Sequence, residues 1–457
     1  MLLQSVIKEL WACVVVSLPV LMAGTTLGWS SPVIEYVAKG NSPFHMTLSE
    51  ESWMITFLDI GNFIMAIPAG ILTDILGRKI AVFLTVPITL AGWILMMIAD
   101  NVWYLYVGRF LHGCAMAISL TVTPIYVGEM ASVALRGSVS LVIELSYASG
   151  LMIAYVMGWL GDYQSLIICC TVIPVITGIL MLYVPESPYY LMLIGKTQEA
   201  ADSLRKLRDY SDKEFEQELQ LITDSTTEIK SKGNLNDLFH RDRRPLIIVS
   251  ALAVLQMACG ASVMEAYASS VLTETSLSAN ACSVIFGAVI MFASVPYALT
   301  VDKYGRRPLY LVSCAGTTLC HIAIYAFLTP NGGHTSGVPL LLAICGSEFF
   351  INMGIMPLLT VVQCEYFPSD TRGMANSVIV FVITFSSTVM LKIYQPIADA
   401  YGKRVNFAGY ALATFLGGIL CYVWVPETKG KSFVQIQTDF ESYMWFGKKK
   451  RKSYEKL

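Results

Sequence analysis

The 457-residue sequence contains few charged side chains. Asp, Glu, Lys and Arg make up only 14% of it, against about 25% in soluble globular proteins. A water-soluble protein of this length would need more polar surface, so the composition excludes an ordinary soluble domain. The net charge of −2 also lacks the basic excess typical of nucleic-acid binding. No nucleic-acid partner is expected.

Catalytic and metal-binding patterns are missing as well. The two histidines inside apolar runs, His112 and His321, have no partner at metal-ligand spacing, and we expect them to be packing residues. No nucleophile, base and orienting group can be assembled from the motifs. Most of the 11 cysteines also fall in apolar runs, where Cys acts as a small apolar residue. We therefore predict no enzyme, no metal and no cofactor.

Long hydrophobic runs are abundant instead. A helix of about 20 apolar residues crosses a membrane core of about 30 Å. The sequence predicts an all-α integral membrane protein with twelve transmembrane helices, at approximately 10–32, 52–73, 80–98, 103–127, 138–159, 163–184, 245–272, 281–300, 309–328, 339–364, 374–395 and 405–425. The first run is longer than a signal-peptide core and shows no clear cleavage site, so we interpret it as a retained span.

The distribution of Lys and Arg predicts the orientation. The connections after every second span, and both tails, hold nearly all of the basic residues, whereas the opposite loops hold only Lys39, Lys403 and Arg404. By the positive-inside rule both termini are cytoplasmic. The "KKKRK" run at 448–452 would lie on the anionic inner leaflet, or form a solvated tail.

Residues 196–243, between the sixth and seventh spans, are highly charged. Apolar residues recur there at helical spacing, and they predict short amphipathic helices outside the membrane. These residues are Ala201, Leu204, Leu207, Phe215, Leu219 and Ile222.

The two halves of the chain repeat each other. "TDILGRK" at 73–79 matches "VDKYGRR" at 301–307, and "PES" at 185–187 matches "PET" at 426–428. Such parallel repeats are typical of transporters with a binding site at the bilayer midplane. We predict an N-terminal six-helix half, a cytosolic helical linker, a C-terminal six-helix half and a basic cytosolic tail, at 1–190, 191–244, 245–428 and 429–457.

These motifs resemble the sugar porter family of the major facilitator superfamily. The resemblance covers about residues 10–440, and it rests on "GILTDILGRK", "GRFLHGCAMAISLTVTPIYVGEMASVALRG", "PESPYYL", "VDKYGRRPL", "EYFPSDTRG" and "VPETKG". "GWSSP" at 28–32 and "ESWM" at 51–54 are similar to the insect trehalose- and glucose-transporter branch. The resemblance implies the major facilitator fold, a small-molecule sugar as substrate, and a monomer in the lipid bilayer.

Paired acids and arginines at cytosolic helix ends are candidate gates. Opposite charges there can form ion pairs between neighbouring helices, which close the inner side in one state and separate in the other. In the alternative interpretation the positive charges only anchor the loops inside, but orientation alone needs no acids. The residues that we assign to this support of gating are Asp74, Arg78, Arg109, Glu129, Arg136, Asp302, Arg306, Glu365 and Arg372.

The family's sugar-binding residues are only partly present. In the seventh span the family pattern Gln-Gln-x-Ser-Gly-x-Asn is replaced by "QMACGAS", which keeps Gln256 and Gly260 and has Ser262 in place of Asn. In the fifth span Glu144 stands where the family has Gln. Each lost amide removes hydrogen bonds that a hexose would use. The substrate-binding candidates are therefore Glu144, Gln256, Gly260 and Ser262.

Glu144 leaves several hypotheses open. It could bind sugar hydroxyls or a neighbouring serine, respond to protons, or favour a cationic substrate. Its expected depth makes direct pairing with Arg109 implausible. Glu265 could recruit cations near the outer gate or face external water. Glu348 and Lys392 could pair across the tenth and eleventh spans.

Proton-linked members of the family pair a carboxylate of the first span with the Arg109 position. Thr26 stands near that place here, so we predict transport without proton coupling. The prediction is a facilitative carrier of a hexose or trehalose in the plasma membrane, working by alternating access. The alternatives are a non-transporting sugar sensor on the same scaffold, or a carrier of a different, cationic solute.

Overall fold

The computed structural model describes residues 2–132, 136–208, 212–229, 235–267, 278–329, 337–367, 371–429 and 440. Within this part of the chain, twelve helical segments are long and apolar enough to cross a membrane, which confirms the predicted number. They are Val6–Ala38, Leu48–Leu76, Arg78–Met97, Val102–Met130, Leu141–Leu160, Tyr163–Met181, Arg243–Ala266, Asn280–Tyr297, Arg306–Phe327, Gly337–Gln363, Gly373–Tyr401 and Lys403–Trp424.

The first six spans are formed by eight helices, and side-chain caps set the starts of α3, α6 and α8. Thr47 and Glu50 form a capping box at the start of α3, and Asn101 accepts a hydrogen bond from the Trp103 N–H at the start of α6. The helices are α1 (Leu2–Gly28), α2 (Ser30–Ala38), α3 (Leu48–Leu76), α4 (Arg78–Phe83), α5 (Thr85–Met97), α6 (Val102–Met130), α7 (Arg136–Leu160) and α8 (Tyr163–Met181).

Short helices follow, and then the last six spans. The connecting helices are α9 (Pro188–Leu193), α10 (Thr197–Leu207), α11 (Asp212–Ile229) and α12 (Leu235–His240). The remaining helices are α13 (Arg243–Ala258), α14 (Ala261–Ala266), α16 (Ala279–Tyr304), α17 (Arg306–Phe327), α18 (Gly337–Phe350), the π-helix η2 (Ile351–Ile355), α19 (Met356–Tyr366), α20 (Arg372–Tyr401) and α21 (Lys403–Trp424).

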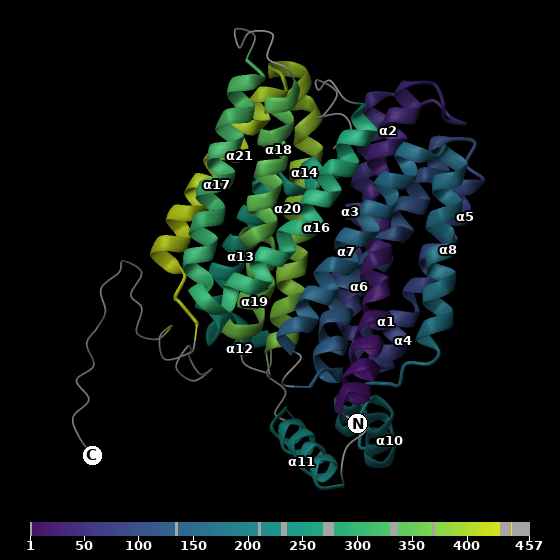
Figure 1. The fold of residues 1–457 in the computed structure, drawn as a ribbon, viewed down its shortest axis with the longest axis vertical. Coiled ribbons are helices and arrows are strands. Elements are labelled where there is room, and N and C mark those ends of the chain that lie inside the picture. The colour runs from purple at the N-terminus through teal and green to yellow at the C-terminus, as the bar shows by residue number, and fades with distance from the viewer. Residues whose placement is uncertain are drawn as a thin grey trace, which may run out of the picture.

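The α10 and α11 helices lie beyond one end of the bundle, next to the start of α1 (Figure 1). This end is called the linker side below, and the opposite end the far side. The predicted amphipathic helices between the halves are present, and Leu204, Leu207 and Ile222 are buried as their spacing predicts.

Each set of six spans packs most extensively within itself. In the N-terminal set α3 lies against α6, and α1 against α7; in the C-terminal set α17 lies against α18 and α21, and α13 against α20. The largest contacts between the sets join α3 to α20 and α7 to α16, and smaller ones join α2 to α16 and α1 to α14. The two largest pair the second span with the eleventh and the fifth with the eighth. In two parallel six-span repeats the second span is equivalent to the eighth, and the fifth to the eleventh. The two contacts are therefore equivalent, as the repeat predicts.

The hydrophobic core is continuous between the sets only toward the far side. One cluster of buried residues contains Trp29 and Tyr155 from the N-terminal set together with Phe286 and Tyr394 from the C-terminal set. On the linker side the described core is divided. One cluster there lies in the first six spans and another lies in the last six. The described packing therefore joins the two halves most tightly on the far side.

The outer surface of the bundle is apolar. On α3 four exposed isoleucines, Ile64, Ile67, Ile71 and Ile75, recur every three or four residues. This spacing places them on one face of the helix. Such a stripe would be a liability in water, and it suits contact with lipid.

Candidate functional site

A cluster of polar residues lies on the linker side of the N-terminal half. The Arg78 guanidinium donates from Nε and Nη2 to the Glu129 carboxylate at 3.0–3.2 Å. The Ser187 hydroxyl donates to the same carboxylate. Asp74 lies 3.7 Å from Arg78 but is 69% exposed, so it adds little.

The C-terminal half repeats this cluster. Arg306 donates from Nη2 to Glu365 at 2.9 Å, and the Thr428 hydroxyl donates to the other oxygen of Glu365 at 2.5 Å. In both halves the glutamate pairs with the arginine at the start of a neighbouring span. The Arg136, Asp302 and Arg372 side chains lie outside the described part of the chain.

A second carboxylate in each half holds the break between two spans. Gly77 and Gly305 have φ of 93° and 91°, which favours glycine. A Cβ on Gly77 would lie 2.5 Å from a Glu186 oxygen, and one on Gly305 would lie 2.7 Å from a Glu427 oxygen. The "PES" and "PET" motifs therefore close the same turn in each repeat.

These two carboxyls differ in electrostatics. Burial raises the pKa of Glu186, although the N–H groups of Ser187 and Lys79 oppose it. Burial also acts to raise the pKa of Glu427, but the backbone N–H groups of residues 306, 307, 428 and 429 outweigh it and hold the pKa below its usual value. The glutamate of this motif therefore stays ionised to lower pH in the second half than in the first.

The seventh span carries three predicted binding residues. The Gln256 amide nitrogen donates to the Met356 carbonyl at 3.1 Å, while its Oε1 is buried without a hydrogen bond in the described part of the chain. Gly260, with φ of 88°, separates α13 from α14. The Ser262 hydroxyl donates to the sulfur of Met257 at 3.2 Å. Gln256 thus keeps a free acceptor, while Ser262 is engaged locally.

Glu144 lies near an acid of the other half. Its side chain is partly exposed. It is close enough to Glu265 for the two charges to interact. The Tyr147 hydroxyl donates to Glu265 Oε2 at 3.0 Å, and the Tyr155 hydroxyl donates to the Glu265 carbonyl at 2.8 Å. Glu265 is 3% exposed, so within the described structure it does not face open solvent.

The predicted pairing of Glu348 with Lys392 is wrong. Lys392 Nζ lies 3.6 Å from the centre of the Trp53 ring and 3.5 Å from the Ser52 hydroxyl. Glu348 accepts a hydrogen bond from Asn352 at 3.2 Å. The two charges lie on neighbouring spans, but the rotation of α20 turns Lys392 toward the first half.

Arg109 is completely buried in the N-terminal half. Its guanidinium donates to the Thr26 carbonyl and to the Ser30 hydroxyl at 3.1 Å, and it lies 5.6 Å from the Trp29 ring centre. Arg109 therefore anchors the end of α1 and the start of α2, through Thr26 and Ser30.

Asp59 is a buried acid that the sequence reasoning missed. It lies on α3, within electrostatic reach of Arg109, and accepts a hydrogen bond from Ser387 of α20 at 2.7 Å. The acid near Arg109 therefore lies on the second span rather than on the first. An acid in an apolar run is a signal for function by default, and that signal could have singled out Asp59.

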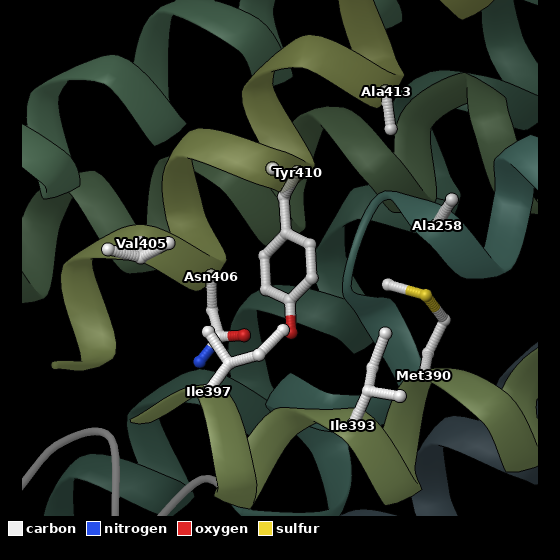
Figure 2. A pocket seen from close by; sticks show the side chains of 9 residues that line it. Ala258, Met390, Ile393, Ile397, Val405, Asn406, Tyr410 and Ala413 are labelled. Atoms are coloured by element: carbon white, nitrogen blue, oxygen red, sulfur yellow. The ribbon is translucent and has the colours of Figure 1, made fainter. Parts of the chain in front are cut away.

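A cavity of about 180 Å³ lies between α13, α20 and α21. Figure 2 shows its lining of apolar side chains, including Met390, Ile393 and Ile397, with Asn406 and Tyr410 as polar members. The Asn406 amide donates to the Tyr394 carbonyl. None of the predicted binding residues lines this cavity, and its chemistry suits an apolar group better than a sugar.

Comparison with known proteins decides the family. The family profile described as "Sugar (and other) transporter" matches residues 16–440. The chain belongs to the sugar transporter family. The transporter is 28% identical to sugar transporter ERD6-like 6 of Arabidopsis thaliana, over 94% of its own length and 90% of that protein. It is also 28% identical to the facilitated trehalose transporter Tret1 of Bombyx mori, over 95% and 87%.

A human relative and a solved structure agree with this assignment. Human solute carrier family 2, facilitated glucose transporter member 6, is 27% identical over 92% of the chain and 88% of that protein. The structure of the proton:xylose symporter XylE superposes with a TM-score of 0.79 at 20% identity, covering 95% and 99% of the two chains. The major facilitator fold is therefore confirmed. The relatives are transporters, and the transporter is not an enzyme.

Proposed function

We propose that this transporter carries a neutral sugar, a hexose or trehalose, down its gradient by alternating access. The observation that carries the proposal is the contrast between its two ends. The described core is shared between the halves on the far side. On the linker side each half has its own core and its own arginine–glutamate cluster. Two halves that share a core at one end and have separate cores at the other suit a rocking motion, in which the α3–α20 contact, which extends to Gly70 and Ser377 toward the linker side, would have to shift.

The orientation and the identity of the moving bodies are part of this proposal. We place both termini and the linker side in the cytosol of a cell whose plasma membrane holds the transporter, because the basic residues gather there. We take residues 1–190 and 245–428 as the two bodies, 191–244 as the linker between them and 429–457 as a cytosolic tail. The named relatives include transporters of trehalose and of glucose, which supports the substrate class.

Uptake into proteoliposomes tests the substrate. Labelled glucose and trehalose are supplied outside, with and without a proton gradient. We expect saturable uptake of one of them, unaffected by the gradient. The matched variants Glu129→Gln and Glu365→Gln each remove the carboxylate of one linker-side cluster. Each should slow uptake about tenfold or more, because a charge-assisted pair contributes about 1.5–3 kcal/mol. Saturable uptake of neither sugar by folded wild type would contradict the proposal.

Proton-linked sugar transport is the second candidate, and Asp59 is the observation that favours it. The acid is buried near Arg109 and bonded to Ser387 across the halves, so gain of a proton would weaken a contact that spans both halves. If this candidate is right, an inward proton gradient drives sugar accumulation and Asp59→Asn removes the accumulation. The control variant Asp399→Asn removes an exposed acid of α20, the helix that carries Ser387, and should keep the accumulation.

A further inference from the structure

The cavity between α13, α20 and α21 opens toward lipid rather than toward the other half. On α20, Ser387 and Lys392 contact residues of α3, and Ile393 projects from roughly the opposite side of the helix. Ile393 and Val405, which both line the cavity, are 41% and 38% exposed. The mouth of the cavity therefore lies on the apolar outer surface of the bundle.

The size and lining of the cavity suit part of an apolar molecule. Its volume is about 180 Å³, and an apolar cavity of about 150 Å³ binds one benzene molecule. A Cβ on the lining residue Gly409 would meet nothing within 4 Å, so the wall formed by α21 is open. Empty space beside hydrocarbon forfeits the contacts that a lipid chain would make. A lipid chain therefore has the right chemistry to fill it.

A buried hydroxyl without a partner belongs to the wall of this cavity. Tyr410 is 3% exposed, and its hydroxyl has no hydrogen-bond partner in the described part of the chain. Figure 2 shows its ring among the lining side chains, with the hydroxyl directed toward Ile397 and Asn406. Burying a hydroxyl without a partner is costly, and such groups are rare in folded proteins. The hydroxyl therefore indicates a missing hydrogen-bonding group.

The Tyr410 ring is held in place and cannot turn away to another partner. A Cβ on Gly260 would lie 2.6 Å from Cδ2 of Tyr410, so the ring packs directly on the break between α13 and α14. The rings of His321 and Phe407 lie against it, at centroid distances of 5.8 and 5.7 Å. The partner of the hydroxyl therefore has to come from a bound molecule.

Basic residues stand at the far-side end of the cavity. The helix α21 begins with Lys403 and Arg404, both partly exposed, and basic side chains at helix ends bind lipid headgroups. With a rise of 1.5 Å per residue, Asn406 lies about 5 Å below Lys403 along the helix. The Tyr410 hydroxyl is directed to the level of Asn406 (Figure 2). Basic end, hydroxyl and apolar cavity thus follow the order of phosphate, ester and acyl chain in a phospholipid.

We propose that this cavity binds one phospholipid of the far-side leaflet. The phosphate lies at Lys403 and Arg404, an ester carbonyl accepts the hydrogen bond of the Tyr410 hydroxyl, and an acyl chain fills the space beside Met390 and Ile393. None of the predicted sugar-binding residues lines the cavity, so the inference goes beyond the proposed function and does not depend on the solute.

Lipid-induced thermal stabilisation of the purified full-length protein in detergent tests the proposal without transport. The probes are dioleoylphosphatidylcholine, its diether analogue without ester carbonyls, dioleoylglycerol without the phosphate, and cholesterol. We expect saturable stabilisation by the phosphatidylcholine, which should bind about two- to tenfold more tightly than the diether analogue, because one hydrogen bond is lost. Dioleoylglycerol should also bind more weakly. Equal affinities for the ester and the diether would overturn the proposal.

Variants assign the preference to the cavity. Tyr410→Phe should abolish the preference for the ester, while the protein without lipid should be at least as stable as wild type, because only an unpaired hydroxyl is lost. Gly409→Leu should weaken binding of both phosphatidylcholines about tenfold or more by filling the cavity, and Leu favours a helix over Gly. Arg404→Gln should narrow the gap between phosphatidylcholine and dioleoylglycerol. The control Ala408→Leu adds the same side chain at an exposed position of α21 outside the lining and should keep the lipid response.

Other outcomes would also contradict this assignment. A preference for the ester that survives in Tyr410→Phe would place the hydrogen bond elsewhere. Stabilisation by every lipid that Gly409→Leu leaves unchanged would mean ordinary contact with the outer surface. Saturable binding of cholesterol but not of phosphatidylcholine, abolished by Gly409→Leu, would assign the cavity to a sterol. Sugar uptake enters none of these measurements, so failure of this inference would leave the proposed transport intact.

Discussion

Single residues in equivalent positions of the two halves behave differently. Glu186 accepts three backbone hydrogen bonds from two residues, whereas Glu427 accepts four from four residues. More donors stabilise the ionised form more strongly. This explains why burial prevails in the pKa of Glu186 and hydrogen bonding prevails in that of Glu427.

The opposite shifts predict opposite pH dependences of stability. The lowered pKa of Glu427 means that its ionised form stabilises the fold above the usual carboxyl pKa, and that this stability is lost as the pH falls through the lowered value. The raised pKa of Glu186 means that its contribution is fullest at low pH and declines as the pH rises through the raised value.

Thermal unfolding of Glu427→Gln and Glu186→Gln between about pH 4 and 7 measures this difference. The destabilisation by Glu427→Gln should grow with rising pH, to about 1 kcal/mol after screening by solvent. The destabilisation by Glu186→Gln should shrink over the same range. Parallel pH dependences in the two variants would show that the repeat motifs are electrostatically equivalent.

At the scale of elements, Arg208 fixes the linker helices to the membrane part. It follows α10 directly and is 4% exposed. Its guanidinium donates to Glu9 of α1 at 3.1 Å, to Glu218 of α11 and to the carbonyl of Met130 at the end of α6. One side chain therefore joins the linker helices to the linker-side ends of two membrane helices, α1 and α6.

We predict that Arg208→Gln destabilises the protein by about 3–5 kcal/mol, because it leaves the buried Glu9 carboxylate without its cationic partner. Arg205→Gln is the matched control. Arg205 is exposed and lies 4.7 Å from the Phe215 ring centre, so its loss should cost less than about 1 kcal/mol. Melting temperature and protease sensitivity of 197–229 measure both effects. Equal losses in the two variants would mean that Arg208 does not hold the linker.

The helices were predictable because the sequence patterns that mark them, hydropathy and apolar spacing, are local. Hydropathy located all twelve spans, and helical spacing identified Leu204, Leu207 and Ile222 as the buried face outside the membrane. The rotation of one helix against another is set by packing between distant segments. The sequence therefore gave no sign that Lys392 turns to Trp53, that Arg208 reaches Glu9, or that Asp59 lies near Arg109.

At the scale of the whole molecule, the repeat made the architecture predictable. Matching motifs in the two halves indicated parallel six-helix units, and the structure assembles equivalent clusters from them: Arg78 with Glu129, and Arg306 with Glu365. The binding site was less accessible to sequence reasoning, because the motif residues Gln256, Gly260 and Ser262 all lie on one span. Their neighbours from other spans, such as Glu348, follow only from the packed structure.

Counterflow in sealed proteoliposomes tests the central claim, sugar transport by alternating access, most directly. Vesicles loaded with unlabelled glucose or trehalose are diluted into a trace of the same labelled sugar, with no proton gradient. A carrier that alternates between two faces should accumulate label transiently above its equilibrium level and then lose it. Label that only rises to equilibrium, or does not enter vesicles holding folded protein, would contradict the account and favour a sensor or a carrier of another solute.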